Sequence, residues 1–298
     1  MDGTEERTGP WGGVDVGERT VGAGARGPAD GPTDPTDPGE AIDTVARRFD
    51  FLTTLTDGPK HRPVLQHELD VSRSTAYKGI RELEELRLVE RTDQGYRLSL
   101  LGKLLLAQYD QFRANVETVC AKGPLLAELS ADCGVTVEVL RDAEVVYAEK
   151  HAPHHPFHVL ETMVEEATAL RGMTPVVRHG YVELFYEQFV ADTLETDLIL
   201  GRPVVQWLAE YQCEPFVAAL ETGNLVVREI EEWVPFGLIL SDEPTTQVGA
   251  FVHDDRGGLR GAVVNDTDDA LAWGERIWER YRDRSTVVTT EVIEADDR

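Results

Sequence analysis

Basic and hydroxyl-bearing side chains recur on one face of the segment Ser72–Arg87. At helical spacing, five such residues fall together toward its N-terminal end: Arg73, Ser74, Tyr77, Lys78 and Arg81. Three apolar residues fall on the opposite side: Ala76, Ile80 and Leu83. Arg and Lys can hydrogen-bond guanine edges in the major groove of DNA, whereas Ser, Thr and Tyr mostly contact phosphates. The pattern therefore predicts a helix that inserts its first turns into the major groove.

The alternative is a solvated charged face, which any small surface helix can carry, so the interpretation depends on the neighbouring elements. An apolar stripe predicts one helix over 42–55, and Gly58-Pro59 ends it. A second helix is expected over 62–69. Ser72 is a natural N-cap for the third helix, which follows directly after the turn at Asp70-Val71.

A hairpin follows the third helix. Short strands are expected at 89–92 and 96–99 around the turn Asp93-Gln94-Gly95. Three helices followed by a hairpin is the order of a winged helix-turn-helix, which we place at 41–100. The predicted DNA-binding residues are Ser72, Arg73, Ser74, Thr75, Tyr77, Lys78 and Arg81 in the helix, with Arg91, Gln94 and Arg97 in the wing.

The charge distribution supports an acidic partner for this region. The whole chain has a net charge of −26, but residues 41–100 contain ten Lys or Arg and ten Asp or Glu. A region without net negative charge in an acidic protein favours double-stranded DNA as partner. The acid excess elsewhere is typical of a protein from a salt-rich cytosol, as in a halophile. Residues 1–40, rich in Gly, Pro and Asp, predict a disordered acidic tail.

Other features bound the function. No apolar run approaches the ~20 residues of a membrane span, so a cytoplasmic protein without membrane contact is expected. The three cysteines have no CxxC spacing. The common enzyme signatures are absent, so we expect the protein to have no catalytic residues and no cofactor. His151, His154, His155 and His158 cluster, but the interleaved prolines favour a loop over a metal site.

The rest of the chain predicts a mixed α/β domain joined to the winged helix by a connecting helix. An apolar stripe over 101–119, within a connecting segment at 101–130, is longer than the winged helix needs and predicts a homodimer. Residues 131–290 are expected to form the α/β output domain. A strand pair is predicted at 135–140 and 144–148, with helices near 157–170, 181–193 and 203–221. Later strand-like runs precede a final amphipathic helix that contains Ala270 and Tyr281.

Polar residues around Met173-Thr174-Pro175 suggest a ligand pocket. Arg171, Arg178 and Tyr181 are the candidate contacts for a small-molecule effector at a strand–helix junction. Salt bridges on an acid-rich surface are an equally good explanation of these residues.

The motifs resemble a known family. The N-terminal part, including its ending Tyr96-Arg97-Leu98-Ser99-Leu100-Leu101-Gly102-Lys103, resembles archaeal winged-helix transcription regulators of the ArsR/TrmB-like kind. The C-terminal part resembles the methanogen-type, or filamentation-regulator, output domain through Arg171-Gly172-Met173-Thr174-Pro175-Val176 and Pro235-Phe236-Gly237-Leu238. Tyr181-Val182-Glu183, Trp273 and Tyr281-Arg282 add to this likeness. The resemblance implies a one-component transcription regulator with a DNA-binding head and a signal-sensing or dimerising domain. An enzyme or a protein-interaction adaptor that carries a winged helix is the alternative.

Overall fold

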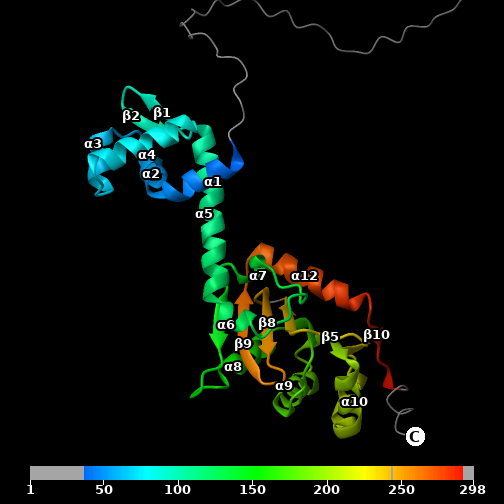
Figure 1. Ribbon diagram of the computed structural model, residues 1–298. Helices are drawn as coiled ribbons and strands as arrows, with labels where there is room; N and C mark the ends of the chain where they lie inside the picture. Colours follow the sequence, from blue (N-terminus) through cyan, green and yellow to red (C-terminus); the bar gives the residue numbers. More distant parts are fainter. Residues whose placement is uncertain (1–36, 243, 291–298) are drawn as a thin grey trace, which may run out of the picture. The chain divides into compact units, whose positions relative to one another are not determined.

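The computed structural model describes residues 37–242 and 244–290, which divide into two compact units between Gly102 and Lys103 (Figure 1). The predicted tail at 1–40 lies almost entirely outside the described residues. Within the two described ranges, no helix is both long enough and apolar enough to cross a membrane. Each unit is considered by itself below.

The N-terminal unit contains helices followed by a two-stranded hairpin. Its elements are α1 (Pro38–Arg47), α2 (Phe49–Thr54), a short 3₁₀ turn η1 (Leu55–Asp57), α3 (Arg62–Glu68), α4 (Arg73–Glu85), β1 (Val89–Thr92) and β2 (Gly95–Leu98). The hairpin is antiparallel, with Val89 opposite Leu98. The fully buried side chains that hold the helices together include Leu52, Leu65, Ile80, Leu83 and Leu88.

The long helix α5 (Leu100–Ala121) starts with a close backbone approach. The Ser99 hydroxyl donates to the Arg87 carbonyl at 2.6 Å and accepts from the Gly102 amide at 3.0 Å, so Ser99 caps the helix. A Cβ on Gly102 would lie 2.0 Å from the Leu88 carbonyl oxygen. Ser99 and Gly102 therefore hold the start of α5 against Arg87 and Leu88, the two residues before β1.

The C-terminal unit is a mixed α/β domain. After α5 come α6 (Gly123–Leu126), α7 (Val137–Leu140), β3 (Glu144–Tyr147), α8 (His155–Glu166), β4 (Ala169–Thr174), α9 (His179–Val190), β5 (Glu195–Gly201), α10 (Arg202–Tyr211), α11 (Cys213–Glu221), β6 (Leu225–Ile230), β7 (Gly237–Ser241), β8 (Gln247–His253), β9 (Leu259–Asn265), α12 (Asp268–Arg282) and β10 (Thr286–Val287). The strands form one sheet in the order β10-β6-β5-β4-β7-β8-β9-β3. The pairs β4–β5 and β5–β6 are parallel, and the others are antiparallel.

Helices cover both faces of the sheet. Neighbouring residues of a strand are therefore buried in different cores, one on each face. Leu198 and Leu200 of β5 join a core with α8, α9, α10 and α11, whereas Ile199 joins a second core with α7 and α12. In β7, Ile239 belongs to the first core and Leu238 to the second. This three-layer arrangement confirms the mixed α/β class expected for the C-terminal part.

The strand predicted at 135–140 is wrong. Residues 137–140 form the helical turn α7, and β3 pairs with β9 instead. Val139 and Leu140 are both buried, which a half-exposed strand would not allow for neighbouring residues. The Asn265 amide donates to the carbonyls of Val139 and Arg141 at 3.1 and 2.6 Å, so a distant strand end holds this turn.

Three predicted helices also need correction. The expected helix at 157–170 ends at Glu166, and β4 begins at Ala169. The expected helix at 203–221 is two helices that meet at Gln212, whose φ and ψ are −135° and 29°. The predicted first helix is likewise divided at Arg48 into α1 and α2.

Candidate functional site

Helix α4 presents the predicted contact face to solvent. Ala76, Gly79, Ile80 and Leu83 are buried against the rest of the N-terminal unit. The residues predicted to contact DNA on the other side are all exposed: Arg73, Ser74, Tyr77, Lys78 and Arg81. The division between the two faces is the one expected from their spacing.

The first turn of α4 is organised by serine and threonine hydroxyls. Ser72 is the N-cap, and its hydroxyl accepts from the Thr75 amide at 3.1 Å, which confirms its predicted capping role. The same hydroxyl lies 2.8 Å from those of Ser74 and Thr75. The amides at this helix end and the hydroxyls around them form a donor-rich, partly positive terminus that suits an anionic group.

Several predicted cations already have carboxylate partners. Arg81 pairs with Glu85 at 2.8 Å, and the longer contact from Lys78 to Glu82 is 3.9 Å. The Glu85 hydrogen bond raises the pKa of Arg81. In the hairpin, Arg97 pairs with Glu90 at 2.7 Å. Arg73 and Arg91 form no ion pair with any residue that the structure describes, and both are exposed.

The hairpin is held beside α4 by Arg62 of α3. Its guanidinium lies 4.9 Å from the ring centre of Tyr77 and 5.0 Å from that of Tyr96. The backbone of Lys60 exchanges two 2.9 Å hydrogen bonds with Tyr96 and adds a bridge to β2. The hairpin candidates Arg91, Gln94 and Arg97 are all exposed. The structure therefore brings the predicted DNA-contact residues together on one unit.

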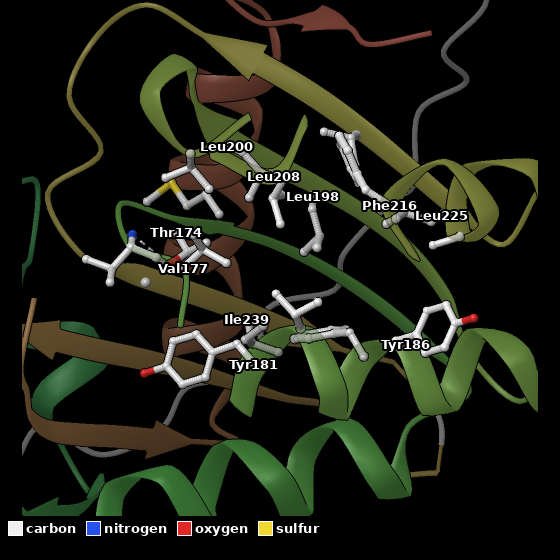
Figure 2. A pocket seen from close by; sticks show the side chains of 18 of the residues that line it. Thr174, Val177, Tyr181, Tyr186, Leu198, Leu200, Leu208, Phe216, Leu225 and Ile239 are labelled. Carbon is white, nitrogen blue, oxygen red and sulfur yellow. Dashed lines mark hydrogen bonds between the residues drawn. The ribbon is translucent and has the colours of Figure 1, made fainter. Parts of the chain in front are cut away.

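The C-terminal domain holds a cavity at the strand–helix junction where the sequence suggests a ligand pocket, with Met173, Thr174 and Tyr181 in its wall. It has a volume of about 120 Å³ and lies between the strands β4–β7 and helices α9, α10 and α11 (Figure 2). Leu198, Leu200 and Ile239 line it from the sheet, and Leu208 and Phe216 line it from the helices.

One part of the cavity wall is polar. The Tyr181 hydroxyl lies 3.4 Å from Nε2 of His253, and Nδ1 of His253 is buried without a hydrogen-bond partner among the described residues. Burial lowers the pKa of His253 to about 4, with Arg178 adding to the effect and the Phe251 carbonyl and Asp254 opposing it only partly. The imidazole is therefore neutral at pH 7. Burial also raises the pKa of Tyr181, so its hydroxyl stays protonated.

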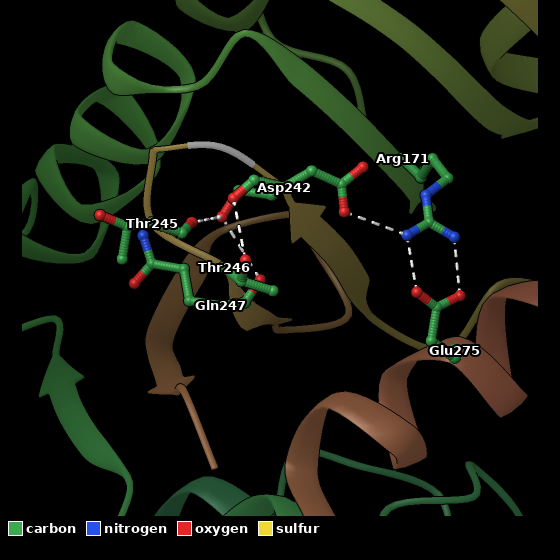
Figure 3. A network of polar contacts seen from close by, with 7 residues as sticks. Arg171, Asp242, Thr245, Thr246, Gln247 and Glu275 are labelled. Carbon is green, nitrogen blue, oxygen red and sulfur yellow. Dashed lines mark hydrogen bonds and ion pairs between the residues drawn. The ribbon is translucent and has the colours of Figure 1, made fainter. Parts of the chain in front are cut away.

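The three residues predicted to share a ligand pocket are not brought together. Tyr181 lines the cavity, whereas Arg171 points from β4 to the opposite face of the sheet (Figure 3). There it forms two hydrogen bonds of 2.6 and 2.7 Å with Glu275 and one of 3.3 Å with Asp242. It also lies 5.5 Å from the ring of Trp278. Arg171 thus joins the sheet to α12, which is the salt-bridge alternative for this residue.

Arg178 and the histidine cluster take other positions. Arg178 is the exposed N-cap residue of α9, and its positive charge lowers the pKa values of His253 and Tyr181. Its carbonyl accepts from the Tyr181 amide at 2.9 Å. Among the residues that the structure describes, no three His, Cys, Asp or Glu side chains form a group that could hold a metal ion. The histidines at 151–158 lie around the start of α8.

Two family models match different parts of the chain. Residues 153–284 match the family model described as "Methanogenesis regulatory protein FilR1, middle domain". The resemblance predicted from the C-terminal motifs is confirmed. This FilR1-like region, residues 153–284, includes α8 to α12, the cavity and the Arg171 network. Residues 40–120 match the model of the "HVO_A0261 N-terminal domain", which covers α1 to α5 almost completely.

A curated relative carries the same name as the FilR1-like region. Methanogenesis regulatory protein FilR1 of Methanothrix harundinacea (strain 6Ac) is 20% identical over 232 residues, which are 74% of this chain and 51% of the relative. The chain therefore spans about half the length of that relative.

Two solved structures show more distant likeness. One is TrmBL2, described as an archaeal chromatin protein with a novel mode of DNA binding, at 13% identity, 85% of this chain, 100% of that chain and a TM-score of 0.39. The other is the phospholipase D family member Nuc from Salmonella typhimurium, at 13% identity, 49% of this chain, 97% of that chain and a TM-score of 0.38. Scores this low establish neither a shared fold nor a shared function.

Proposed function

We propose that this protein is a DNA-binding transcription regulator. In this proposal the N-terminal unit is a winged helix-turn-helix, α4 is its recognition helix and the β1–β2 hairpin is its wing. The observation that carries the proposal is the division of α4 into a buried apolar face and an exposed face with Arg73, Lys78 and Arg81. The regulatory name of the matched relative supports it.

The contacts divide by side-chain type. Arg73, Lys78 and Arg81 are the candidates for base edges, because their side chains are long cations on the exposed face. The hydroxyl groups and amides of the first turn would contact phosphates, together with the wing. Arg81 and Lys78 would exchange a carboxylate partner for DNA, whereas Arg73 has no such partner to give up among the described residues.

The proposed regulator is a homodimer. Three apolar side chains of α5 lie at helical spacing and are exposed: Phe112 at 60%, Val116 at 42% and Val119 at 41%. Covering them with a second copy of α5 would remove this apolar surface from water. We expect the double substitution Phe112→Asp with Val116→Asp to halve the sedimentation mass, while Trp233→Asp, at an exposed aromatic residue elsewhere, leaves it unchanged. A monomeric unmodified protein at micromolar concentration would contradict the dimer.

The C-terminal domain has the sensing role in this proposal. Its cavity would hold the effector, and the regulatory name of the family model that matches residues 153–284 supports this role. We therefore propose a one-component regulator that is not an enzyme and acts at the chromosome.

The test is sequence-specific DNA binding by the full chain. Selection from random duplexes would define the operator, and fluorescence anisotropy would give its affinity. We expect Arg73→Ala, Lys78→Ala or Arg81→Ala to weaken operator binding by about 1–3 kcal/mol where the side chain reads a base. Arg256→Ala removes an exposed cation from the β8–β9 turn of the other unit and should change nothing. Failure to enrich any sequence, or unchanged affinity in all three variants, would refute the proposal.

A further inference from the structure

The cavity of the C-terminal domain has the size of a ligand site. Its volume of about 120 Å³ is close to that of an engineered apolar cavity of about 150 Å³ that binds benzene in another protein. Protein interiors are normally close-packed, and a void of this size is unusual in a domain core. Several lining residues of α9 and of the segment before it, Val177, Tyr181, Phe185 and Tyr186, are only partly buried. These side chains form the least buried part of the cavity wall.

The lining excludes a charged ligand. None of the described residues that form the cavity wall is Asp, Glu, Lys or Arg. Burying an unpaired charge there would cost far more than the contacts return. Arg171 of β4 is held by Glu275 on the opposite face of the sheet. The charge of Arg178 reaches His253 and Tyr181, but its side chain is exposed and does not form part of the wall. The occupant must be neutral.

The polar part of the wall selects one hydrogen-bonding group. Thr174 Oγ1 is already used, because it donates to the Val176 carbonyl at 2.8 Å and accepts the Val176 amide at 3.2 Å. Tyr181 and His253 are different. Their mutual contact is long, at 3.4 Å, and His253 Nδ1 lacks a partner although the residue is 91% buried. A ligand hydroxyl between the Tyr181 hydroxyl and Nε2 of His253 could replace this long contact with short hydrogen bonds.

We propose that this cavity binds a neutral, largely apolar molecule of about one aromatic ring that carries a single hydroxyl or equivalent group, which hydrogen-bonds at the Tyr181–His253 pair. The binding itself needs no DNA. Only its effect on operator affinity rests on the proposed function, so the two can fail separately.

The test uses the full chain without DNA and three probes that share one aromatic ring: benzene, phenol and benzoate. Ligand-detected NMR and calorimetry at pH 7.5 would measure each affinity. We expect phenol to bind with a Kd on the order of 1 mM or below, benzene several-fold more weakly, and benzoate not at all. Benzoate binding as tight as that of phenol would overturn the proposal, as would no binding of phenol at 10 mM (about ten times the expected Kd).

Two variants locate the binding. Ala219→Leu adds carbon atoms to a buried lining residue of α11 and should weaken phenol and benzene at least tenfold. Its matched control, Ala218→Leu, changes the adjacent residue, which does not line the cavity, and should keep both affinities. Tyr181→Phe should lower phenol binding to the level of benzene and leave benzene unchanged, even if Ala219→Leu does not fold. Phenol affinity that is unchanged in both Ala219→Leu and Tyr181→Phe places the ligand elsewhere and refutes the site.

Discussion

At the scale of single residues, Arg62 connects three elements of the N-terminal unit. Its guanidinium lies against Tyr77 of α4 and Tyr96 of β2, and it reaches Glu84 at 3.7 Å. Nε of Arg62 is buried and has no hydrogen-bond partner among the described residues. Stacking on two aromatic rings, rather than hydrogen bonding, therefore fixes this side chain.

We expect Arg62→Ala to destabilise the N-terminal unit by about 1–2 kcal/mol, because each cation–π contact contributes roughly 0.5–1 kcal/mol and the two tyrosines lose their common neighbour. Urea unfolding of the full chain, followed by tyrosine and far-UV signals, would measure the change. Arg91→Ala, at an exposed arginine of the same hairpin, should stay within about 0.5 kcal/mol. Equal effects of the two substitutions would refute the bridging role.

His253 gives the C-terminal domain a predictable dependence on pH. Its pKa is about 4 in the folded protein and 6.5 as the ordinary value, so between these values the unfolded chain binds the extra proton. Above pH 6.5 the imidazole is neutral in both states, and its titration does not affect the free energy of unfolding. As the pH falls from 6.5 toward 4, protonation of the unfolded chain lowers that free energy by roughly 3 kcal/mol. Comparing unfolding free energies of the unmodified protein and His253→Gln from pH 7.5 to 4.5 isolates the effect. A difference that does not change with pH would contradict it.

At the scale of elements, the start of α5 depends on a residue without a side chain. Gly102 lies against the Leu88 backbone, where a Cβ would come within 2.0 Å of the carbonyl oxygen. Because the obstacle is backbone that also accepts from Ser99, it cannot move aside cheaply.

Gly102→Ala should therefore cost about 2–4 kcal/mol of stability, although alanine is the better helix former. The control is Gly123→Ala at the start of α6, where nothing lies within 4 Å and the change should be neutral or slightly stabilising. Thermal unfolding of both variants decides the matter. A Gly102→Ala protein as stable as the control would show that the close approach of Gly102 to the Leu88 backbone does not limit stability.

At the scale of the whole molecule, charge sets how DNA binding should respond to salt. The chain has a net charge of −26, and Arg81 and Arg97 already have carboxylate partners. Each phosphate neutralised by a free cation steepens the fall of log K with log salt by about 0.9. A face whose cations are internally paired should release fewer counterions.

We expect a shallow salt dependence of operator affinity, which Glu85→Gln combined with Glu90→Gln should steepen. Glu165→Gln with Glu166→Gln makes the same charge change in exposed residues of α8 and should leave the slope as it was. Anisotropy titrations from low to molar KCl would measure both. If the two double variants have equal slopes, the paired carboxylates do not control the salt response.

The sequence predicts the elements that repeat a pattern and misses those that depend on distant partners. The stripe of α4 and its Ser72 cap are local, and both were predictable. The α7 turn is held by Asn265, more than a hundred residues away, and its β-branched composition indicates a strand instead. Arg171 and Tyr181 are close in sequence, which suggests that they share a pocket. Because side chains alternate along β4, Arg171 lies on the other face of the sheet, where it pairs with Glu275. The sequence suggests a pocket near Met173-Thr174-Pro175, but most of the cavity wall comes from apolar residues of distant elements such as Leu208 and Phe216, which no local spacing indicates.

The two faces of the sheet also differ in how freely they can change over evolutionary time. Residues such as Leu198, Ile239 and Ala219 form the cavity wall, while the ion pair between Arg171 and Glu275 lies on the other side. Substitutions in the wall can alter its shape without touching the ion pair that joins β4 to α12. If the cavity has the proposed sensing role, a lineage of such proteins can therefore exchange one effector for another by a few apolar replacements and keep its scaffold. Descendants that respond to unrelated molecules should differ at the cavity wall and share the arginine and its glutamate.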